Sequence, residues 1–311
     1  MAIPTAGIHG QIAGGRGGKH AVVLMICYAR SGGTLLNRCL GALPGVVILS
    51  EVHPLGGGTG APGTPALTTV RDQAAAWYGI TLQSEDFVEN LVEIENHCDR
   101  RGLHLVMREW SFLNFTPCPE NDHRPPNRLV TLEALRERCL VRPFAFVRDA
   151  IDVWLSRSVP LEEFAEPYRR YVQALVDSQV PIFRYEDFCR DPDNQMRHLC
   201  DACELPFSGA YRQYEQFTHV NGDVQGPSRG RKQGGFAILP RRRIGPAQRA
   251  RLRACAAIRR ANELLGYPVD YAARPREGYV PYLRRTVGRV FHRGRPIIRP
   301  VTSTHLEPEA S

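Results

Sequence analysis

The stretch VVLMICYARSGGTLLNRCL, Val22–Leu40, joins a continuous apolar run to a segment with helical periodicity. The apolar run is typical of a parallel strand that is buried on both faces. Leucine and cysteine recur on one stripe after Thr34, which predicts an amphipathic helix. Between the two segments lies a short turn with adjacent glycines, Gly32 and Gly33. Strand, glycine turn and helix in this order predict a loop that binds a phosphate-like anion at the helix N-terminus.

The turn itself carries the groups that bind a tetrahedral oxyanion. The backbone N–H groups of Gly32 and Gly33 lie at the positive end of the predicted helix. Ser31 and Thr34 add hydroxyl groups, and Arg30 adds a cation. A nucleoside-triphosphate loop has a lysine directly before its Ser or Thr, and here that position holds glycine. The turn therefore predicts an oxyanion site that differs from the usual kinase loop.

Apolar runs and helical patterns alternate along the rest of the chain. The predicted strands are Val22–Tyr28, Val46–Leu49, Leu103–Met107, Pro143–Val147 and the beginning of Val180–Phe188, whose end is predicted as an exit turn. The predicted helices are Thr34–Leu43, 68–78, 85–100, 131–138, 148–157, 162–178, 193–204 and one closing helix, Pro246–Tyr267. This alternation predicts an α/β fold of three layers, with a parallel β-sheet of the P-loop nucleotide-binding type flanked by helices.

Length and charge predict one domain with two extensions. The 311 residues divide into a flexible N-terminus (1–19), an α/β domain (20–272) and a basic tail (273–311). Eight arginines against one glutamate give the segment from Arg274 to Arg299 a charge of +7, whereas the whole chain carries +8. The rest is nearly neutral, so a nucleic-acid-binding function depends on the tail alone. For the tail, disorder and peripheral contact with a membrane surface are both open.

The sequence contains no clear targeting signal or metal-binding motif. No apolar run long enough for a transmembrane span or a signal peptide occurs, and the nine cysteines lack regular spacing. Free thiols fit a reducing compartment. We therefore expect a cytoplasmic, possibly membrane-peripheral protein. Cys200 and Cys203 form one close pair without a second pair at zinc-site spacing, so no metal is expected.

A second anion site is predicted at the end of the fourth strand, because ligands of parallel α/β sheets bind beyond the carboxyl ends of the strands. Arg148 follows that strand, and Ser156 lies two helical turns further on. An arginine fork and a hydroxyl at this spacing suit a phosphate. The alternative is that Arg148 pairs with Asp149 or Asp152 on the helix surface.

The order of the motifs resembles that of sulfotransferases that use 3′-phosphoadenosine 5′-phosphosulfate (PAPS). YARSGGTLL resembles their 5′-phosphosulfate loop, FVRDAIDVWLSR their 3′-phosphate motif, RYEDF their adenine-contacting segment and RGRKQGG their basic loop at the 3′-phosphate. The resemblance spans roughly residues 20–268 and implies PAPS as the sulfuryl donor, with no metal. The implied donor-binding residues are Arg30, Ser31, Gly32, Gly33, Thr34, Leu35, Arg148, Ser156, Tyr185, Arg231 and Lys232.

The catalytic base is assigned less directly than the donor-binding residues. Many family members use a histidine after the third strand, and the segment VMREWSF has none there. The region resembles the tyrosylprotein and carbohydrate sulfotransferases, in which a glutamate acts as base; this implies Glu51, with Arg30 stabilising the bridging oxygen. A helix cap or a pair with Arg30 is the alternative for Glu51. Glu109 is the second candidate base, and pairing with Arg108 is its alternative role.

The expected function is therefore sulfuryl transfer from PAPS to a hydroxyl of a carbohydrate, lipid or secondary metabolite, by in-line displacement with a carboxylate base. The expected acceptor is a small molecule or a glycan or lipid, and no nucleic acid is expected as partner. Two alternatives stay open at this point. One is a P-loop kinase that uses ATP, and the other is a nucleic-acid-binding protein that uses the basic tail.

Overall fold

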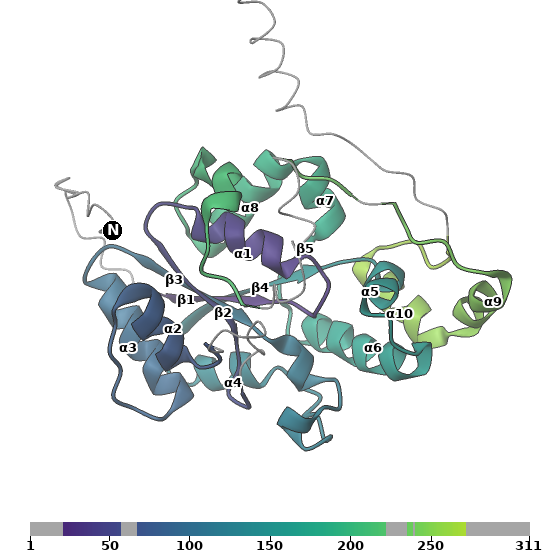
Figure 1. The fold of residues 1–311 in the computed structure, drawn as a ribbon, viewed down its shortest axis with the longest axis horizontal. Helices are drawn as coiled ribbons and strands as arrows, with labels where there is room; N and C mark the ends of the chain where they lie inside the picture. The colour runs from purple at the N-terminus through teal and green to yellow at the C-terminus, as the bar shows by residue number, and fades with distance from the viewer. Residues whose placement is uncertain (1–20, 57–66, 222–234, 239, 272–311) are drawn as a thin grey trace, which may run out of the picture.

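The computed structural model describes residues 21–56, 67–221, 235–238 and 240–271. Within them, five strands form one sheet in the order β2-β3-β1-β4-β5, and every pairing is parallel (Figure 1). The strands are β1 (Ala21–Ile26), β2 (Val46–Val52), β3 (His104–Glu109), β4 (Leu140–Val147) and β5 (Ile182–Arg184). The sheet confirms the predicted parallel α/β class.

Helices cover both faces of the sheet, as the predicted three layers require (Figure 1). Helices α1, α7 and α8 share one apolar core with the sheet, and α2, α3, α4, α5, α6 and α10 share the other. The helices are α1 (Gly33–Gly41), α2 (Val70–Tyr78), α3 (Phe87–Asp99), α4 (Val130–Arg136), α5 (Ala150–Arg157), α6 (Leu161–Asp177), α7 (Tyr185–Arg190), α8 (Pro192–Cys203), α9 (Pro246–Ala254) and α10 (Ala256–Leu265). Three short 3₁₀ helices are η1 (Ser111–Asn114), η2 (Pro119–Asn121) and η3 (Gly209–Gln216).

The end of β1 divides its side chains between these two cores. Cys27 lies in the core beneath α1, and the next residue, Tyr28, lies in the opposite core against Phe164 and Tyr168. This is the alternation that extended backbone imposes. The glycine turn therefore begins at the sheet edge with one face toward α1 and the other toward α6.

The closing helix differs from the prediction, because the chain breaks at Cys255 into α9 and α10. Cys255 has an extended ψ of 94°. In one continuous helix, at about 100° per residue, Leu252 and Ile258 would point about 120° apart. The break lets both side chains enter the same core. The apolar stripe of the sequence therefore belongs to two helices.

Two further boundaries differ from the prediction. Strand β2 continues past Leu49 to Val52, and the predicted exit turn after β5 is the helix α7. The predicted segments 1–19 and 273–311 lie outside the described residues, as do Arg231 and Lys232. No helix in the described ranges combines the length and apolar character that crossing a bilayer requires.

A buried ion cluster ties the chain before α9 to the N-terminus of α5. Arg241 donates to Asp149 through Nη2, and to Asp152 through Nε at 2.9 Å. All three side chains are buried. The Asn262 side chain accepts from Ala150 N–H at 2.9 Å and donates to Asp149 at 3.2 Å, which adds α10 to the cluster. The residues after Arg148 are thus held by two segments, α10 and the chain before α9.

Replacement of Arg241 by methionine tests this cluster. Arg241→Met should lower the free energy of unfolding by about 3–5 kcal/mol, because two buried aspartates lose their cation. Urea denaturation measures the change. The matched control is Arg251→Met, which removes an exposed pair with Glu162 and should have a far smaller effect. Equal effects of the two substitutions would show that the buried cluster does not stabilise the fold.

Candidate active site

The turn between β1 and α1 leaves the N-terminus of α1 open. Ser31 N–H donates to the Tyr28 carbonyl at 3.2 Å, and Arg30 and Gly32 both have positive φ, 75° and 93°. Gly32 is the N-cap of α1, and no side chain bonds to the first turn. The unpaired N–H groups of a helix N-terminus carry a partial positive charge. The loop therefore has the geometry that the sequence predicts for an oxyanion site.

The two glycines are required by what packs against them. A Cβ on Gly32 would lie 2.5 Å from Tyr185 Cδ2, and a Cβ on Gly33 would lie 2.6 Å from Cys27 Sγ and 3.0 Å from Arg108 Nε. Tyr185 of α7 and Arg108 of β3 thus both pack against the loop backbone. From the sequence, Arg108 is considered only as a partner of Glu109.

Buried polar atoms without hydrogen-bond partners gather around this loop. Nine such side-chain atoms occur in the described residues, and four of them are Ser31 Oγ, Arg108 Nε, Arg108 Nη1 and Arg148 Nε. Buried polar atoms are nearly always paired, so each exception calls for an explanation. Ser31 is fully buried, and Arg108 is 5% exposed. These side-chain atoms therefore lack acceptors within the described part of the chain.

Glu51 projects from a β-bulge at the end of β2. The pairing of β2 with β3 shifts between Ser50 and Val52, and Glu51 has a left-handed φ of 53°. A bulge of this kind redirects the extra side chain and is frequent beside active sites. The Glu51 carboxylate accepts a hydrogen bond from Arg108 Nη2, and the two side chains are 12% and 6% exposed.

This ion pair settles two of the alternatives. Glu51 pairs with Arg108, not with Arg30, and Arg108 does not pair with Glu109. Both alternative pairings considered from the sequence are therefore wrong. Arg108 lies between Glu51 on one side and the backbone of Gly33 on the other.

Helix α2 holds the bulge in place. The Gln73 side chain donates to the Ser50 carbonyl at 2.8 Å and accepts from Ser50 N–H at 2.7 Å. Asn221 N–H donates to Ser50 Oγ at 3.0 Å. Because the residue before Glu51 is bonded through three of its polar groups, the direction of the Glu51 side chain is fixed from outside the sheet.

Glu109, the second candidate base, is enclosed in a hydrogen-bond network. Its carboxylate accepts from Ser111 Oγ at 2.7 Å and from Asn114 Nδ2 at 3.0 Å, and its side chain is fully buried. Ser111 Oγ also accepts from Cys27 N–H at 3.1 Å, which links the ends of β3 and β1. A carboxylate held in this way positions backbone and offers no open oxygen to an acceptor hydroxyl.

The predicted second anion site lies on the other side of Tyr185. The guanidinium carbon of Arg148 is 4.9 Å from the Tyr185 ring centroid, and Arg148 Nε is 3.9 Å from Glu186 Oε1. Asp149 and Asp152 pair with Arg241, so the alternative pairing of Arg148 is wrong. Ser156 is half-buried on α5.

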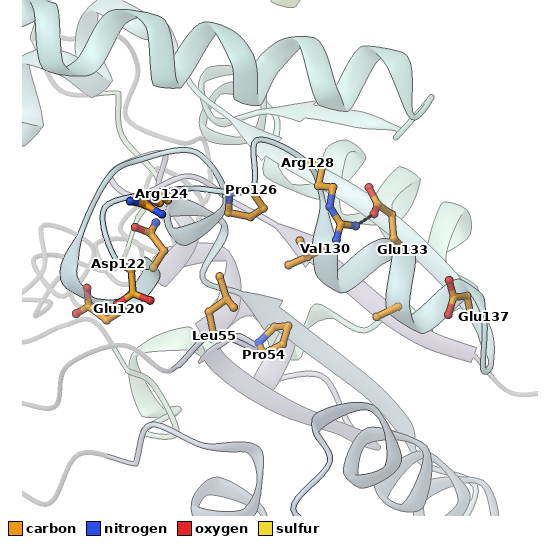
Figure 2. Close-up of a pocket in the computed structure, with 12 residues that line it drawn as sticks. Pro54, Leu55, Glu120, Asp122, Arg124, Pro126, Arg128, Val130, Glu133 and Glu137 are labelled. Atoms are coloured by element: carbon orange, nitrogen blue, oxygen red, sulfur yellow. Dashed lines mark hydrogen bonds and ion pairs between the residues drawn. The ribbon is translucent and has the colours of Figure 1, made fainter.

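One cavity of about 530 Å³ lies apart from this site (Figure 2). It is bounded by Pro54 and Leu55 after β2, by the η2 region and by α4, and no residue of the glycine turn lines it. Glutamate and aspartate outnumber arginine on its walls; the charged residues are Glu120, Asp122, Arg124, Arg128, Glu133 and Glu137. This charge balance is unsuitable for a nucleotide with several negative charges.

No protein-family model matches the sequence, and no curated protein matches it significantly. Solved structures similar to the chain include a sulfotransferase domain from the curacin biosynthetic pathway (14% identity, TM-score 0.49, 80% of this chain and 98% of that one). A sulfotransferase domain of the Synechococcus PCC 7002 olefin synthase has 16% identity and a TM-score of 0.46, over 90% of this chain and 98% of that one.

A mouse sulfotransferase in complex with PAP, the desulfated form of PAPS, is similar at 12% identity and a TM-score of 0.42, over 88% of this chain and 89% of that one. These solved structures are sulfotransferases. At this level of similarity, the function of the chain has to be argued from its own residues.

The imidazole of His53 gives a prediction about pH. Burial lowers the pKa of His53, although Glu109 and the hydrogen bond with Asn114 act in the opposite direction. Unfolding exposes the ring, which then binds protons near pH 6.5. The free energy of unfolding should therefore fall as the pH decreases below about 6.5 toward the lower pKa of the folded state.

Urea unfolding of wild type and His53→Gln at several pH values between 4 and 8 checks this prediction. Glutamine keeps a donor for Asn114 and removes the titrating ring. The difference in unfolding free energy between the two proteins should change with pH below about 6.5 and be constant above it. A difference that is constant over the whole range contradicts the lowered pKa.

Proposed function

We propose that the protein is a sulfotransferase that transfers a sulfuryl group from PAPS to an acceptor hydroxyl of a carbohydrate, lipid or secondary metabolite. The observation that carries the proposal is the presence of buried donors without hydrogen-bond partners at two places beside one aromatic ring. Ser31 and Arg108 lie on the loop side of Tyr185, and Arg148 lies over its face. PAPS has a phosphosulfate and a separate 3′-phosphate, joined through an adenosine.

The residues fit the donor in both charge and shape. The phosphosulfate would bind at the N-terminus of α1, to Arg30, Ser31, Gly32, Gly33, Thr34 and Leu35. The missing Cβ of Gly33 leaves room beside Arg108, and burial raises the pKa of the neighbouring Cys27 thiol to about 12. The thiol is therefore neutral and does not repel an anion. Any residue other than glycine at position 33 would place a Cβ in the space beside Arg108.

The remaining donor contacts follow from the second site. The 3′-phosphate would bind Arg148 and the hydroxyl of Ser156, with the adenine against Tyr185. The Tyr185 hydroxyl donates to the Ala237 carbonyl at 3.2 Å, which fixes the plane of the ring. Arg231 and Lys232, outside the described residues, remain proposed contacts of the same phosphate.

Glu51 is the proposed base. As the acceptor oxygen attacks sulfur, its proton passes to Glu51 and the bond from sulfur to the bridging oxygen breaks, which leaves PAP. Arg30 and Arg108 stabilise the negative charge that develops on the bridging oxygen. Arg108 bonds to Glu51 through Nη2. An anion beside Gly33 would bind the remaining nitrogens of the same guanidinium, Nε and Nη1.

A P-loop kinase that uses ATP is the less favoured alternative. The loop lacks the lysine of a kinase phosphate loop and carries Arg30 and Gly33 instead. Its second cation, Arg108, comes from β3. In the described part of the chain, no three side chains of His, Cys, Asp or Glu are placed together so that they could hold a metal ion. Binding experiments with and without magnesium separate the two functions.

Arg148→Ala tests the nucleotide site. PAP should raise the unfolding temperature of the wild type without magnesium. The substitution should weaken PAP binding by about 1.5–3 kcal/mol, the range for a charge-assisted bond to phosphate. Calorimetry with PAP and with AMP, which lacks the 3′-phosphate, measures the effect. Equal weakening of both ligands would mean that Arg148 acts on the fold, and a requirement for magnesium would favour the kinase.

Glu51→Gln tests the base. The amide keeps an acceptor for Arg108 and cannot take a proton, so turnover should fall by about a hundredfold or more. PAP affinity should stay the same or rise, because Arg108 loses a competing anion. Turnover is followed by release of PAP from PAPS with an active acceptor.

Glu109→Gln is the matched control. Its new NH₂ group would face one of the two donors, Ser111 or Asn114, so the unfolding temperature should fall. Turnover per folded molecule should stay within a few-fold of wild type. If Glu109→Gln abolishes turnover in a folded protein that binds PAP, and Glu51→Gln does not, then the base lies after β3.

A further inference from the structure

Arg157, the last residue of α5, lies on an aromatic platform at the edge of the proposed site. Its guanidinium carbon is 4.4 Å from the ring centroid of Phe112 and 5.7 Å from that of Tyr28. Trp110 stacks on Phe112, with 6.0 Å between the ring centroids. Trp110, Phe112 and Arg157 are all half-buried. An arginine held flat on aromatic rings keeps its in-plane N–H groups available to a ligand.

The platform faces the side of the sheet edge opposite α1. Tyr28 and Phe112 belong to the core beneath α6, whereas Cys27 and Gly33 belong to the side of α1. The proposed donor contacts of the loop lie at the N-terminus of α1. Arg157 therefore lies beside the same glycine turn, on the side away from α1.

Arg157 has a cation as its charged neighbour. No carboxylate in the described ranges pairs with Arg157 or with Arg30, and burial together with the charge of Arg30 lowers the pKa of Arg157. Arginine nevertheless stays protonated in proteins. Arg157 is half-buried and Arg30 is exposed. The two cations repel each other, and an anion between them or beside them relieves this repulsion. The arrangement is typical of a binding site for a negatively charged group.

We propose that Arg157, with Trp110 and Phe112, binds an anionic group of the sulfuryl acceptor, so that the acceptor class is hydroxyl compounds that carry a carboxylate or phosphate beside an apolar segment. This inference rests on the proposed function. The guanidinium pairs with the anion as a fork, and the two half-buried rings contact the apolar segment.

The competing assignments are less well supported. Both anions of the donor already have buried, unpartnered donors at Ser31, Arg108 and Arg148, so Arg157 is left for another ligand. A cationic acceptor would instead use the acidic cavity beyond Pro54 (Figure 2). The two acceptor classes differ in the sign of one charge, which makes them separable with matched probes.

The experiment uses three probes that share a 4-hydroxyphenyl group: 3-(4-hydroxyphenyl)propionate, its primary amide and tyramine. Binding of each to the full chain is measured by calorimetry or by saturation-transfer NMR, with and without saturating PAP. The propionate should bind the wild type about tenfold or more tightly than the amide, as expected for one charge-assisted bidentate pair. Arg157→Met should remove this preference, and Arg157→Lys should keep part of it.

Arg251→Met, on the exposed face of α9, is the control and should keep the full preference. PAP affinity should be the same in wild type and Arg157→Met. Equal binding of propionate and amide, tighter binding of tyramine, or no binding of the propionate overturns the inference. A loss of PAP affinity in Arg157→Met as large as the loss of propionate affinity also overturns the inference, because Arg157 would then be a donor contact. A protein that prefers the propionate through Arg157 and binds no PAP supports the anion site and refutes the proposed donor.

Discussion

The guanidinium of Arg108 is the constraint on which the rest of the site depends. It is a buried cation with one carboxylate, Glu51, on one side and the Gly33 backbone on the other. A buried ion pair is stable only when its remaining donors are satisfied, and Arg108 retains two unpartnered nitrogens. In the proposed donor complex, an anion at the loop would complete the pairing. The glycine turn, the bulge at Glu51 and the approach of β3 are therefore parts of one electrostatic arrangement.

The position of that arrangement follows from the sheet. In the order β2-β3-β1-β4-β5, the central strand β1 delivers the glycine turn, β3 delivers Arg108, and β4 delivers Arg148. Because all five strands are parallel, these side chains meet at one edge. The alternation of Cys27 and Tyr28 then assigns the two faces of the edge, with α1 and its N-terminus on one face and the aromatic platform on the other.

Much of this could be predicted from local patterns. The apolar runs predict parallel strands, the glycine turn predicts the open helix N-terminus, and the strand ends place Arg148 near the same edge. The pairing of Glu51 with Arg108 could not be predicted, since it joins residues 57 positions apart through a bulge that leaves no mark in the sequence. The break at Cys255 could not be predicted either, because local periodicity does not show which core the apolar side chains of a helix enter. These features depend on long-range packing.

Arg148 shows how a binding cation is kept available beside acidic residues. The sequence puts Asp149 and Asp152 next to it, and either could neutralise it on the helix surface. Arg241 binds both aspartates instead, from a segment about ninety positions away. Because that cluster is buried and saturated, the charge of Arg148 is directed to the Tyr185 side of the helix. The surroundings of Arg148 are thus set by an arginine of another segment.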